Sequence, residues 1–269
     1  MTSAGAAMAV AAAPVRDLFG IPVSALTLEE VLDLVDHAVA TRTPLQIGVV
    51  NAAKVVNMGR DPLLRQDVLA SDVILADGIA VVWAARVLGS PLPERVAGIN
   101  LMAGIMRRGQ ARGYGVFCLG ASDEVLQRTV ARMAARYPRV RIVGSHNGYF
   151  TEPEEPAVAQ AIAEARPDVL FVAMTSPRKE MFLARWSKRL AVPVCHGVGG
   201  AFDVVAGKVR RAPPSWQRLG LEWLYRVMQE PGRLWRRYLV TNTLFCGMVL
   251  RAMLRRLTAG PQRQAAKLR

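Results

Sequence analysis

Six short apolar runs alternate with helical patterns between residues 45 and 195, and this alternation constrains the fold more than any other feature of the chain. Runs of this length that are rich in Val, Ile and Leu are typical of strands buried on both faces. Strands that alternate with helices form βαβ units, which build a parallel sheet. The expected strands are Leu45–Val50, Val73–Leu75, Gly115–Leu119, Val140–Val143, Val169–Ala173 and Val192–Cys195.

Two of the intervening segments have a clear helical pattern. Ser122–Tyr137 places apolar residues at helical spacing and begins with an Ala-Ser-Asp-Glu sequence that is typical of a helix start. Glu180–Leu190 has the same pattern between the fifth and sixth expected strands. We therefore expect an α/β fold whose mainly parallel sheet carries helices on both faces.

The positive charge of the chain is concentrated at its C-terminal end. The formal net charge is +14, but residues 208–269 carry 14 Lys and Arg against 2 acids, whereas residues 1–207 carry 21 basic and 19 acidic residues. Such an asymmetry indicates that the tail meets an anionic partner: a nucleic acid, an anionic membrane surface or a phosphorylated substrate.

These features divide the chain into three parts. Residues 3–13 are small and apolar, and no Lys or Arg precedes them, so we expect residues 1–13 to be a disordered leader rather than a signal peptide. Residues 14–207 form the expected α/β domain, and residues 208–269 a basic amphipathic helical appendage. The longest charge-free stretch of the appendage, Tyr238–Leu250, has 13 residues, fewer than the about 20 that span a bilayer. We therefore expect no membrane span.

Polar, glycine-rich segments follow five of the expected strands. Ligands bind beyond the carboxyl ends of parallel strands, so these segments predict a site for a phosphorylated small molecule. Each segment alone also fits plain turn chemistry, since Gly, Asp and Ser end strands for backbone reasons. The segments are Asn51–Lys54, Ala76–Gly78, Gly120–Ser122, Met174–Glu180 and Gly197–Asp203.

The motifs of common cofactor and metal sites are missing from these segments. Gly197–Phe202 has only the first two glycines of a dinucleotide-binding motif, and there is no P-loop motif. The three histidines lack metal-ligand spacing, no Asp-x-Asp occurs, and Cys118, Cys195 and Cys246 lie far apart. We expect no metal, no cofactor and a reducing compartment. Any diphosphate would then be neutralised by arginines.

Five motifs together are specific enough to indicate a family. Their order and spacing resemble the WecG/TagA/CpsF family of bacterial glycosyltransferases (glycosyltransferase family 26) over roughly residues 20–240. The motifs are Ala76–Ala80 (ADGIA), Glu94–Asn100 (ERVAGIN), Thr175–Glu180 (TSPRKE), Gly197–Pro213 (GVGGAFDVVAGKVRRAP) and Leu219–Pro231 (LGLEWLYRVMQEP).

The resemblance implies a Rossmann-like α/β fold and an inverting glycosyltransferase. Such an enzyme moves a sugar, commonly N-acetylmannosamine, from a UDP-sugar donor to a polyprenyl-diphosphate-linked glycan acceptor in bacterial cell-surface or exopolysaccharide synthesis. It acts in the cytoplasm, peripherally on the inner face of the cell membrane. Other family members move other sugars, so the sugar stays open, and the sequence leaves a homo-oligomer open as well.

The resemblance also assigns roles to single residues. The family's proposed base falls on Asp77, which takes the proton of the acceptor hydroxyl; the alternative is that Asp77 caps the following helix. Arg95 is expected to hold the donor phosphate or the acceptor, the alternative being an exposed loop arginine. Val49 and Lys179 replace residues that the family often has as Thr and Gln. The other expected substrate-binding positions are Asn51, Ser176, Glu180, Gly199 and Gly200. Three arginines of the tail are expected to contact the lipid diphosphate: Arg226, Arg233 and Arg236.

The tail has the composition of a membrane-interface segment. Apolar residues including Trp216, Trp223 and Trp235 recur at helical spacing among its arginines. One alternative is that these apolar faces dock on the α/β domain, and we expect the tail to fold over the crevice when membrane and acceptor are present. A second alternative is a nucleic-acid-binding protein, and the absence of a nucleic-acid motif argues against it. A third is a catalytically inactive membrane scaffold, and the presence of Asp77, Asn51 and Arg95 argues against it.

Overall fold

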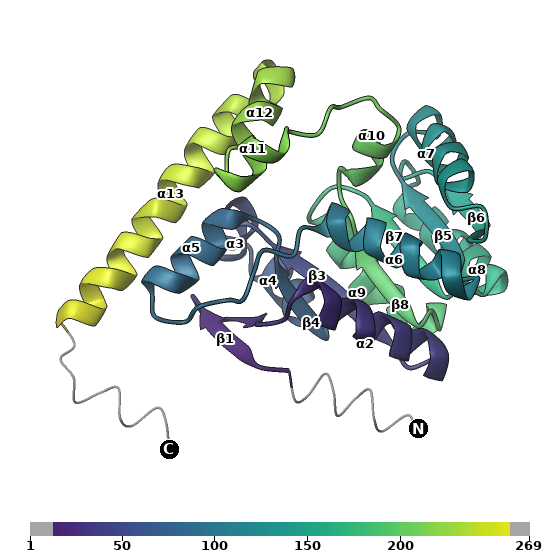
Figure 1. The fold of residues 1–269 in the computed structure, drawn as a ribbon, viewed down its shortest axis with the longest axis horizontal. Coiled ribbons are helices and arrows are strands. Elements are labelled where there is room, and N and C mark those ends of the chain that lie inside the picture. The colour runs from purple at the N-terminus through teal and green to yellow at the C-terminus, as the bar shows by residue number, and fades with distance from the viewer. Residues whose placement is uncertain (1–12, 259–269) are drawn as a thin grey trace.

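The centre of the molecule is a parallel sheet of six strands (Figure 1). The structure, a computed structural model, describes residues 13–258. Along the sheet the strand order is β4-β3-β8-β7-β5-β6, and each neighbouring pair is parallel. The strands are β3 (Leu45–Val50), β4 (Val73–Ala76), β5 (Gly115–Gly120), β6 (Arg141–His146), β7 (Val169–Ala173) and β8 (Val194–Gly197).

Helices cover both faces of the sheet because both faces are apolar. On β7, for example, Phe171 packs into one core cluster, whereas Leu170 and Val172 pack into another on the opposite face. The first face is covered by α2 (Leu28–Thr41), α6 (Gly98–Arg112), α7 (Asp123–Arg136) and α10 (Ala201–Val205). The second is covered by α3 (Ala52–Met58), α4 (Pro62–Leu69), α5 (Ile79–Val87), α8 (Glu155–Ala165, after the 3-10 turn Glu152–Glu154) and α9 (Arg178–Leu190).

The predicted fold class is confirmed: all six expected strands form within a few residues of their predicted bounds. A two-stranded hairpin, β1 (Val15–Leu18) and β2 (Ile21–Ser24), was not predicted. Its turn consists of Phe19 and Gly20, both with positive φ (58° and 71°). Phe is uncommon at a position with positive φ. The turn therefore has the sequence Phe-Gly and not the Asn-Gly or Asp-Gly sequence that usually marks a hairpin.

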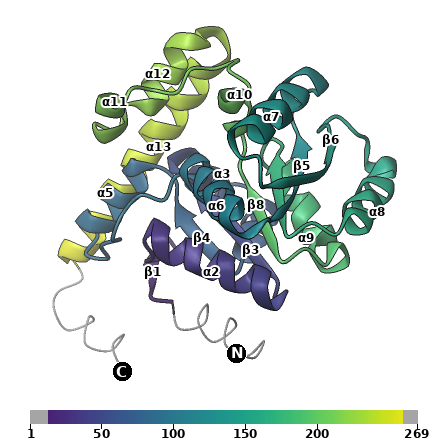
Figure 2. The ribbon, with the colours of Figure 1, turned by 45° about the vertical axis from the view of Figure 1, so that its right-hand side comes forward.

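The basic tail forms three helices that pack against the α/β domain (Figures 1 and 2). They are α11 (Pro214–Arg218), α12 (Glu222–Gln229) and α13 (Pro231–Thr258). The helical spacing expected between Trp216 and Trp223 is interrupted at Gly220, where φ is +72°. A Cβ on Gly220 would lie 2.5 Å from Cγ2 of Ile79, so the break also lets the tail approach the start of α5.

Helix α13 docks on the domain through one face. Phe245 is buried in the core cluster formed with α3, α5 and the β1–β2 hairpin, and its ring meets that of Phe19 edge-on, with 6.0 Å between the ring centroids. The predicted leader lies outside the described residues apart from Ala13, and so do residues 259–269 of the predicted appendage. Within residues 13–258, no helix is long and apolar enough to cross a membrane.

Candidate functional site

The strand order directs the polar segments after β3, β4 and β8 to one place. The chain runs from β3 outward to β4 and then crosses to β5, on the other side of β8. The connections that leave the sheet beside β3 and β8 therefore run away from each other. In open parallel sheets, such a point leaves a crevice at the carboxyl ends of the strands. Three of the predicted segments, those that begin at Asn51, Ala76 and Gly197, lie at this crevice.

Asp77 lies directly after β4 and is half-buried. Its main-chain nitrogen donates to the oxygen of Val50 (2.9 Å), and its Oδ1 accepts a hydrogen bond from the main-chain nitrogen of Gly98 (2.8 Å). Gly98 is the first residue of α6, so Asp77 does not cap α5, the helix that follows it in sequence. Within the described part of the chain, Oδ2 has no hydrogen-bond partner, which leaves it available to a ligand.

Asn51 lies beside Asp77 at the end of β3. It caps α3, because its Oδ1 accepts a hydrogen bond from the main-chain nitrogen of Lys54 (3.0 Å). A Cβ on Gly78 would lie only 3.2 Å from Cβ of Asn51, so glycine lets the ends of β3 and β4 approach closely. The segment predicted as a loop after β3 is therefore the first turn of a helix, and the amide nitrogen of Asn51 remains for a ligand.

A buried histidine connects β8 to Asp77. His196 is fully buried in β8, and its Nε2 donates to the main-chain oxygen of Gly98 (3.2 Å). The same residue Gly98 donates its N–H to Asp77. His196 therefore fixes the start of α6, which in turn orients the Asp77 carboxylate. No spacing or motif in the sequence distinguishes this histidine from the other two.

The burial of His196 makes stability depend on pH in a predictable way. Burial lowers the pKa of His196 to about 4 from an ordinary 6.5. Above pH 6.5 the imidazole is neutral in both the folded and unfolded chain. Between pH 6.5 and 4 only the unfolded chain binds the proton, so the free energy of unfolding falls by about 3 kcal/mol. We expect His196→Gln to remove this part of the acid sensitivity.

Urea unfolding at a series of pH values measures the effect. The difference in unfolding free energy between the wild-type protein and His196→Gln should be constant above pH 7 and change by about 3 kcal/mol toward pH 4. Parallel pH profiles for the two proteins would contradict a buried, neutral imidazole.

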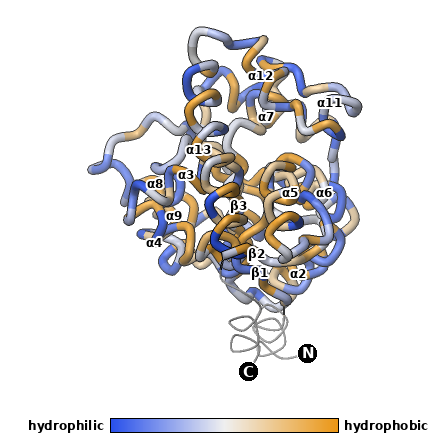
Figure 3. Tube along the Cα trace, turned by 90° about the vertical axis from the view of Figure 1, so that its left-hand side faces the viewer, coloured by the Kyte–Doolittle hydropathy of each residue, from blue (hydrophilic) through white to orange (hydrophobic). Residues whose placement is uncertain are grey.

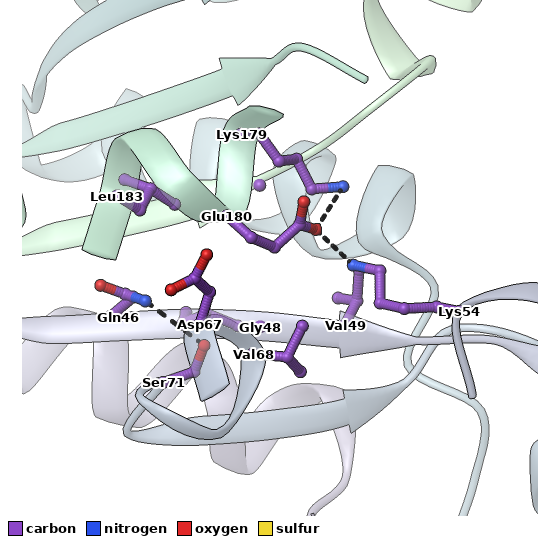
Figure 4. A pocket seen from close by; sticks show the side chains of 12 residues that line it. Gln46, Gly48, Val49, Lys54, Asp67, Val68, Ser71, Lys179, Glu180 and Leu183 are labelled. Atoms are coloured by element: carbon purple, nitrogen blue, oxygen red, sulfur yellow. Dashed lines mark hydrogen bonds and ion pairs between the residues drawn. The ribbon is translucent and has the colours of Figure 1, made fainter. Parts of the chain in front are cut away.

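Beneath the crevice lies a buried cluster of two lysines and a glutamate (Figure 4). Nζ of Lys54 lies 2.7 Å and Nζ of Lys179 lies 3.3 Å from Oε1 of Glu180, and all three side chains are buried. Burial, together with the neighbouring Lys179, lowers the pKa of Lys54 to about 8. Burial alone would raise the pKa of Glu180, but the two ammonium groups hold it below its ordinary value.

The hollow beside this cluster is too small for a substrate. It has a volume of about 20 Å³, room for one water molecule, and Oε2 of Glu180 lies buried without a hydrogen-bond partner. Burial and the nearby Glu180 also raise the pKa of Asp67, which lines the same hollow. A larger open hollow of about 440 Å³ lies beside His146 and Tyr149, and no predicted site residue lines it.

Glycines at the end of β8 and just after it allow cationic side chains to approach the backbone. A Cβ on Gly197 would lie 3.0 Å from Cε of Lys179, and a Cβ on Gly200 would lie 2.6 Å from Nη2 of Arg226. Gly199 has a φ of +52°, which favours glycine. The predicted residues Gly199, Gly200 and Arg226 are thus brought together, although α12 and β8 belong to different parts of the chain.

Arg95 is also in contact with the tail. The segment that contains Arg95 runs beside β4, since the main-chain nitrogen of Val96 donates to the oxygen of Ala76 (3.0 Å). Its guanidinium forms an ion pair with Glu222, the first residue of α12. Arg95 is therefore not a free loop arginine, because it joins the segment beside β4 to the start of α12.

The remaining predicted residues lie in the loop before α9 and in α13. Oγ of Ser176 is buried without a hydrogen-bond partner in the loop before α9. Arg236 is exposed on α13. The backbone of Arg233 lies in α13, but its side chain is outside the described part of the structure. Among the described side chains, neither Ser176 nor Arg236 has a hydrogen bond or ion pair that joins it to the crevice.

The outward face of α13 is apolar. Trp235, Leu239, Leu250 and Leu257 are each more than half exposed and recur at spacings that place them along one side of the helix. Arg236, Arg251 and Arg255 are exposed beside them. Figure 3 shows this side of the molecule, with hydrophobic and hydrophilic residues alternating along the tail. The opposite face carries Phe245 and is docked.

Comparison with known proteins agrees with the motifs at this site. The model of the family described as "Glycosyl transferase WecG/TagA/CpsF family" matches residues 16–259. A protein of Bacillus spizizenii, N-acetylglucosaminyldiphosphoundecaprenol N-acetyl-beta-D-mannosaminyltransferase, is 38% identical over 170 residues. The match covers 63% of this chain and 65% of that protein, slightly less than two thirds of its length.

Proposed function

The chain belongs to the WecG/TagA/CpsF family of glycosyltransferases, and on this basis we propose that it moves a sugar from a UDP-sugar to a polyprenyl-diphosphate-linked saccharide in bacterial cell-surface polysaccharide synthesis. The relative named above supports N-acetylmannosamine or a related hexose derivative as the sugar. The observation that carries the proposal is the free oxygen of the Asp77 carboxylate at the crevice between β3, β4 and β8.

In the proposed reaction, Asp77 acts as general base. Its Oδ2 takes the proton of an acceptor hydroxyl while the hydroxyl oxygen attacks the anomeric carbon of the donor sugar. The bond between that carbon and the β-phosphate oxygen breaks, its electron pair leaves with UDP, and the anomeric configuration inverts. The hydrogen bond from Gly98 to Oδ1 keeps the carboxylate in place without occupying the oxygen that takes the proton.

Cationic and amide groups around the crevice bind the substrates in this proposal. Arg226 beside Gly200 offsets negative charge on the leaving diphosphate, and Arg95 holds a phosphate. Asn51 binds a sugar hydroxyl through its amide nitrogen, and Ser176 binds substrate at the loop before α9. Glu180 acts indirectly, because it holds Lys179 beneath the glycine segment. Arg233 and Arg236 meet the lipid diphosphate of the acceptor.

A panel of nucleotide sugars tests the donor class. A ligand at 100 times its Kd stabilises a folded protein by about 2.7 kcal/mol, so its binding raises the melting temperature. We expect UDP-sugars to raise the melting temperature and GDP-sugars at the same concentration to leave it unchanged. Equal shifts with both classes would contradict recognition of a UDP-sugar.

We also propose that the protein associates peripherally with the inner face of the cell membrane. The apolar stripe of α13 supports this, because exposed Trp and Leu flanked by Arg suit a membrane interface. Each arginine near an anionic surface adds about 1 kcal/mol of attraction. Tail residues 208–269 carry 14 Lys and Arg, enough for strong attraction even after screening by salt.

Two substitutions on α13 test the membrane contact without disturbing the docked face. We expect Trp235→Ser with Leu239→Ser to weaken binding to phosphatidylglycerol vesicles about tenfold or more, because two apolar side chains no longer enter the interface. Tyr149→Ser, which removes an exposed aromatic residue far from the tail, serves as the control. Vesicle sedimentation measures the change, and equal binding of both variants would refute the assigned face.

A further inference from the structure

Two arginines from different segments converge on one glutamate of the tail. Arg95 contacts Oε2 of Glu222, and Nε of Arg211 lies 3.8 Å from Oε1 of the same carboxylate. Arg211 also donates from Nη2 to Oδ1 of Asn100 in α6 (2.7 Å), which fixes its position. Among the described residues, its buried Nε has no hydrogen-bond partner. Two guanidinium groups are therefore directed at a single carboxylate that only partly satisfies them.

The surroundings favour an anion with more charge than one carboxylate. The side chain of Arg95 is only 13% exposed, and within residues 13–258 Glu222 is the one acid paired with it. Arg226 lies one helical turn beyond Glu222 on α12, with its guanidinium against Gly200. Arg95 and Arg211 thus place two positive charges against the one negative charge of Glu222, and Arg226 follows on the same helix. Guanidinium groups bind phosphate oxygens in the same two-pronged manner as carboxylates.

Glu222 is able to leave this position. It is the first residue of α12, and its side chain is 31% exposed, so a rotamer change carries the carboxylate into solvent. A diphosphate offers more oxygens and more negative charge to the same two arginines. Binding of the diphosphate would then replace one ion pair by stronger ones.

We propose that Arg95 and Arg211 form a diphosphate-binding site and that Glu222, which contacts both arginines, competes with the diphosphate for them. This inference rests on the proposed function, in which both donor and acceptor carry a diphosphate. It adds Arg211 as a binding residue and gives Glu222 a gating role: entry of the diphosphate displaces Glu222 and releases the start of α12 from Arg95.

Binding of inorganic pyrophosphate, measured by calorimetry, tests the competition. Glu222→Gln keeps the size of the side chain but removes its charge, so we expect pyrophosphate to bind about five- to tenfold more tightly. Arg211→Met should weaken binding by at least the same factor. Glu164→Gln, the same chemical change on the exposed face of α8, controls for the change in net charge and should leave the Kd unchanged.

Other outcomes would overturn the inference. Weaker pyrophosphate binding by Glu222→Gln would mean that Glu222 positions the arginines rather than competing for them. Unchanged binding would mean that the two arginines do not form the site. Because pyrophosphate binding requires no sugar transfer, these results are independent of whether the proposed reaction occurs.

The source of the diphosphate is distinguished by two further ligands. UDP represents the donor and geranyl diphosphate the lipid acceptor. If the site serves the donor, Glu222→Gln should tighten the binding of UDP alone. If the site serves the acceptor, the same substitution should tighten the binding of geranyl diphosphate alone. A gain for either ligand supports the site, and a gain for neither overturns it.

Discussion

Replacing Asp77 by asparagine is expected to reduce the rate of sugar transfer by a factor of 10² to 10⁴, the usual contribution of a general base. Asparagine keeps the oxygen that accepts the hydrogen bond from Gly98, so the local structure should persist. It cannot take a proton from the acceptor hydroxyl. The fall should therefore appear in kcat, with little change in the affinity for the donor.

The two readouts separate the catalytic role from a structural one. Donor binding, measured by calorimetry with UDP, should stay within about threefold of the wild-type value. The melting temperature should also be unchanged. Transfer at the wild-type rate would remove Asp77 as the base, whereas loss of both binding and stability would mean that the carboxylate mainly fixes the start of α6.

A second large effect is expected at Glu180, this time on stability. Glu180→Gln leaves the ammonium groups of Lys54 and Lys179 buried without a compensating charge. Removal of one partner from a buried ion pair typically costs 3–5 kcal/mol. For a chain of this size, that loss lowers the melting temperature by roughly 10 °C. Chemical denaturation of the variant measures the free energy directly.

Lys54→Met provides the matched control for Glu180. It removes one of the two buried ammonium groups, and Glu180 keeps its contact with Lys179 at 3.3 Å. We therefore expect Lys54→Met to be clearly less destabilising than Glu180→Gln. Equal losses of stability for both, or no loss for Glu180→Gln, would contradict the arrangement of two cations around one carboxylate.

The sheet could be predicted from the sequence because each strand is a local pattern. Runs such as Val169–Ala173 are apolar throughout, because their side chains are buried on both faces of the sheet. The hairpin was missed because Phe19, which rarely adopts positive φ, stands in its turn, and the tail break at Gly220 was missed because the apolar spacing continues on both sides of that glycine. Helix α3 was also missed, because its first turn looks like a polar loop.

The site was predictable only in part. Family motifs selected Asp77, Arg95, Gly200 and Arg226, and the fold brings these near one crevice. The partners that hold them are distant in sequence: Lys54 and Glu180 lie 126 residues apart, and Arg95 and Glu222 lie 127 apart. Periodicity and spacing report neighbours within one element, so such pairings emerge only from the folded chain.

The most direct test of the account is the transfer reaction itself. Purified protein is incubated with radiolabelled UDP-N-acetylmannosamine and a short-chain prenyl-diphosphate-N-acetylglucosamine, and the label is followed from the aqueous to the organic phase. We predict that label enters the lipid fraction with wild-type protein and that UDP is released in equal amount. If no sugar of a UDP-sugar panel reaches the lipid, while the protein is folded and binds UDP, the proposed function is wrong.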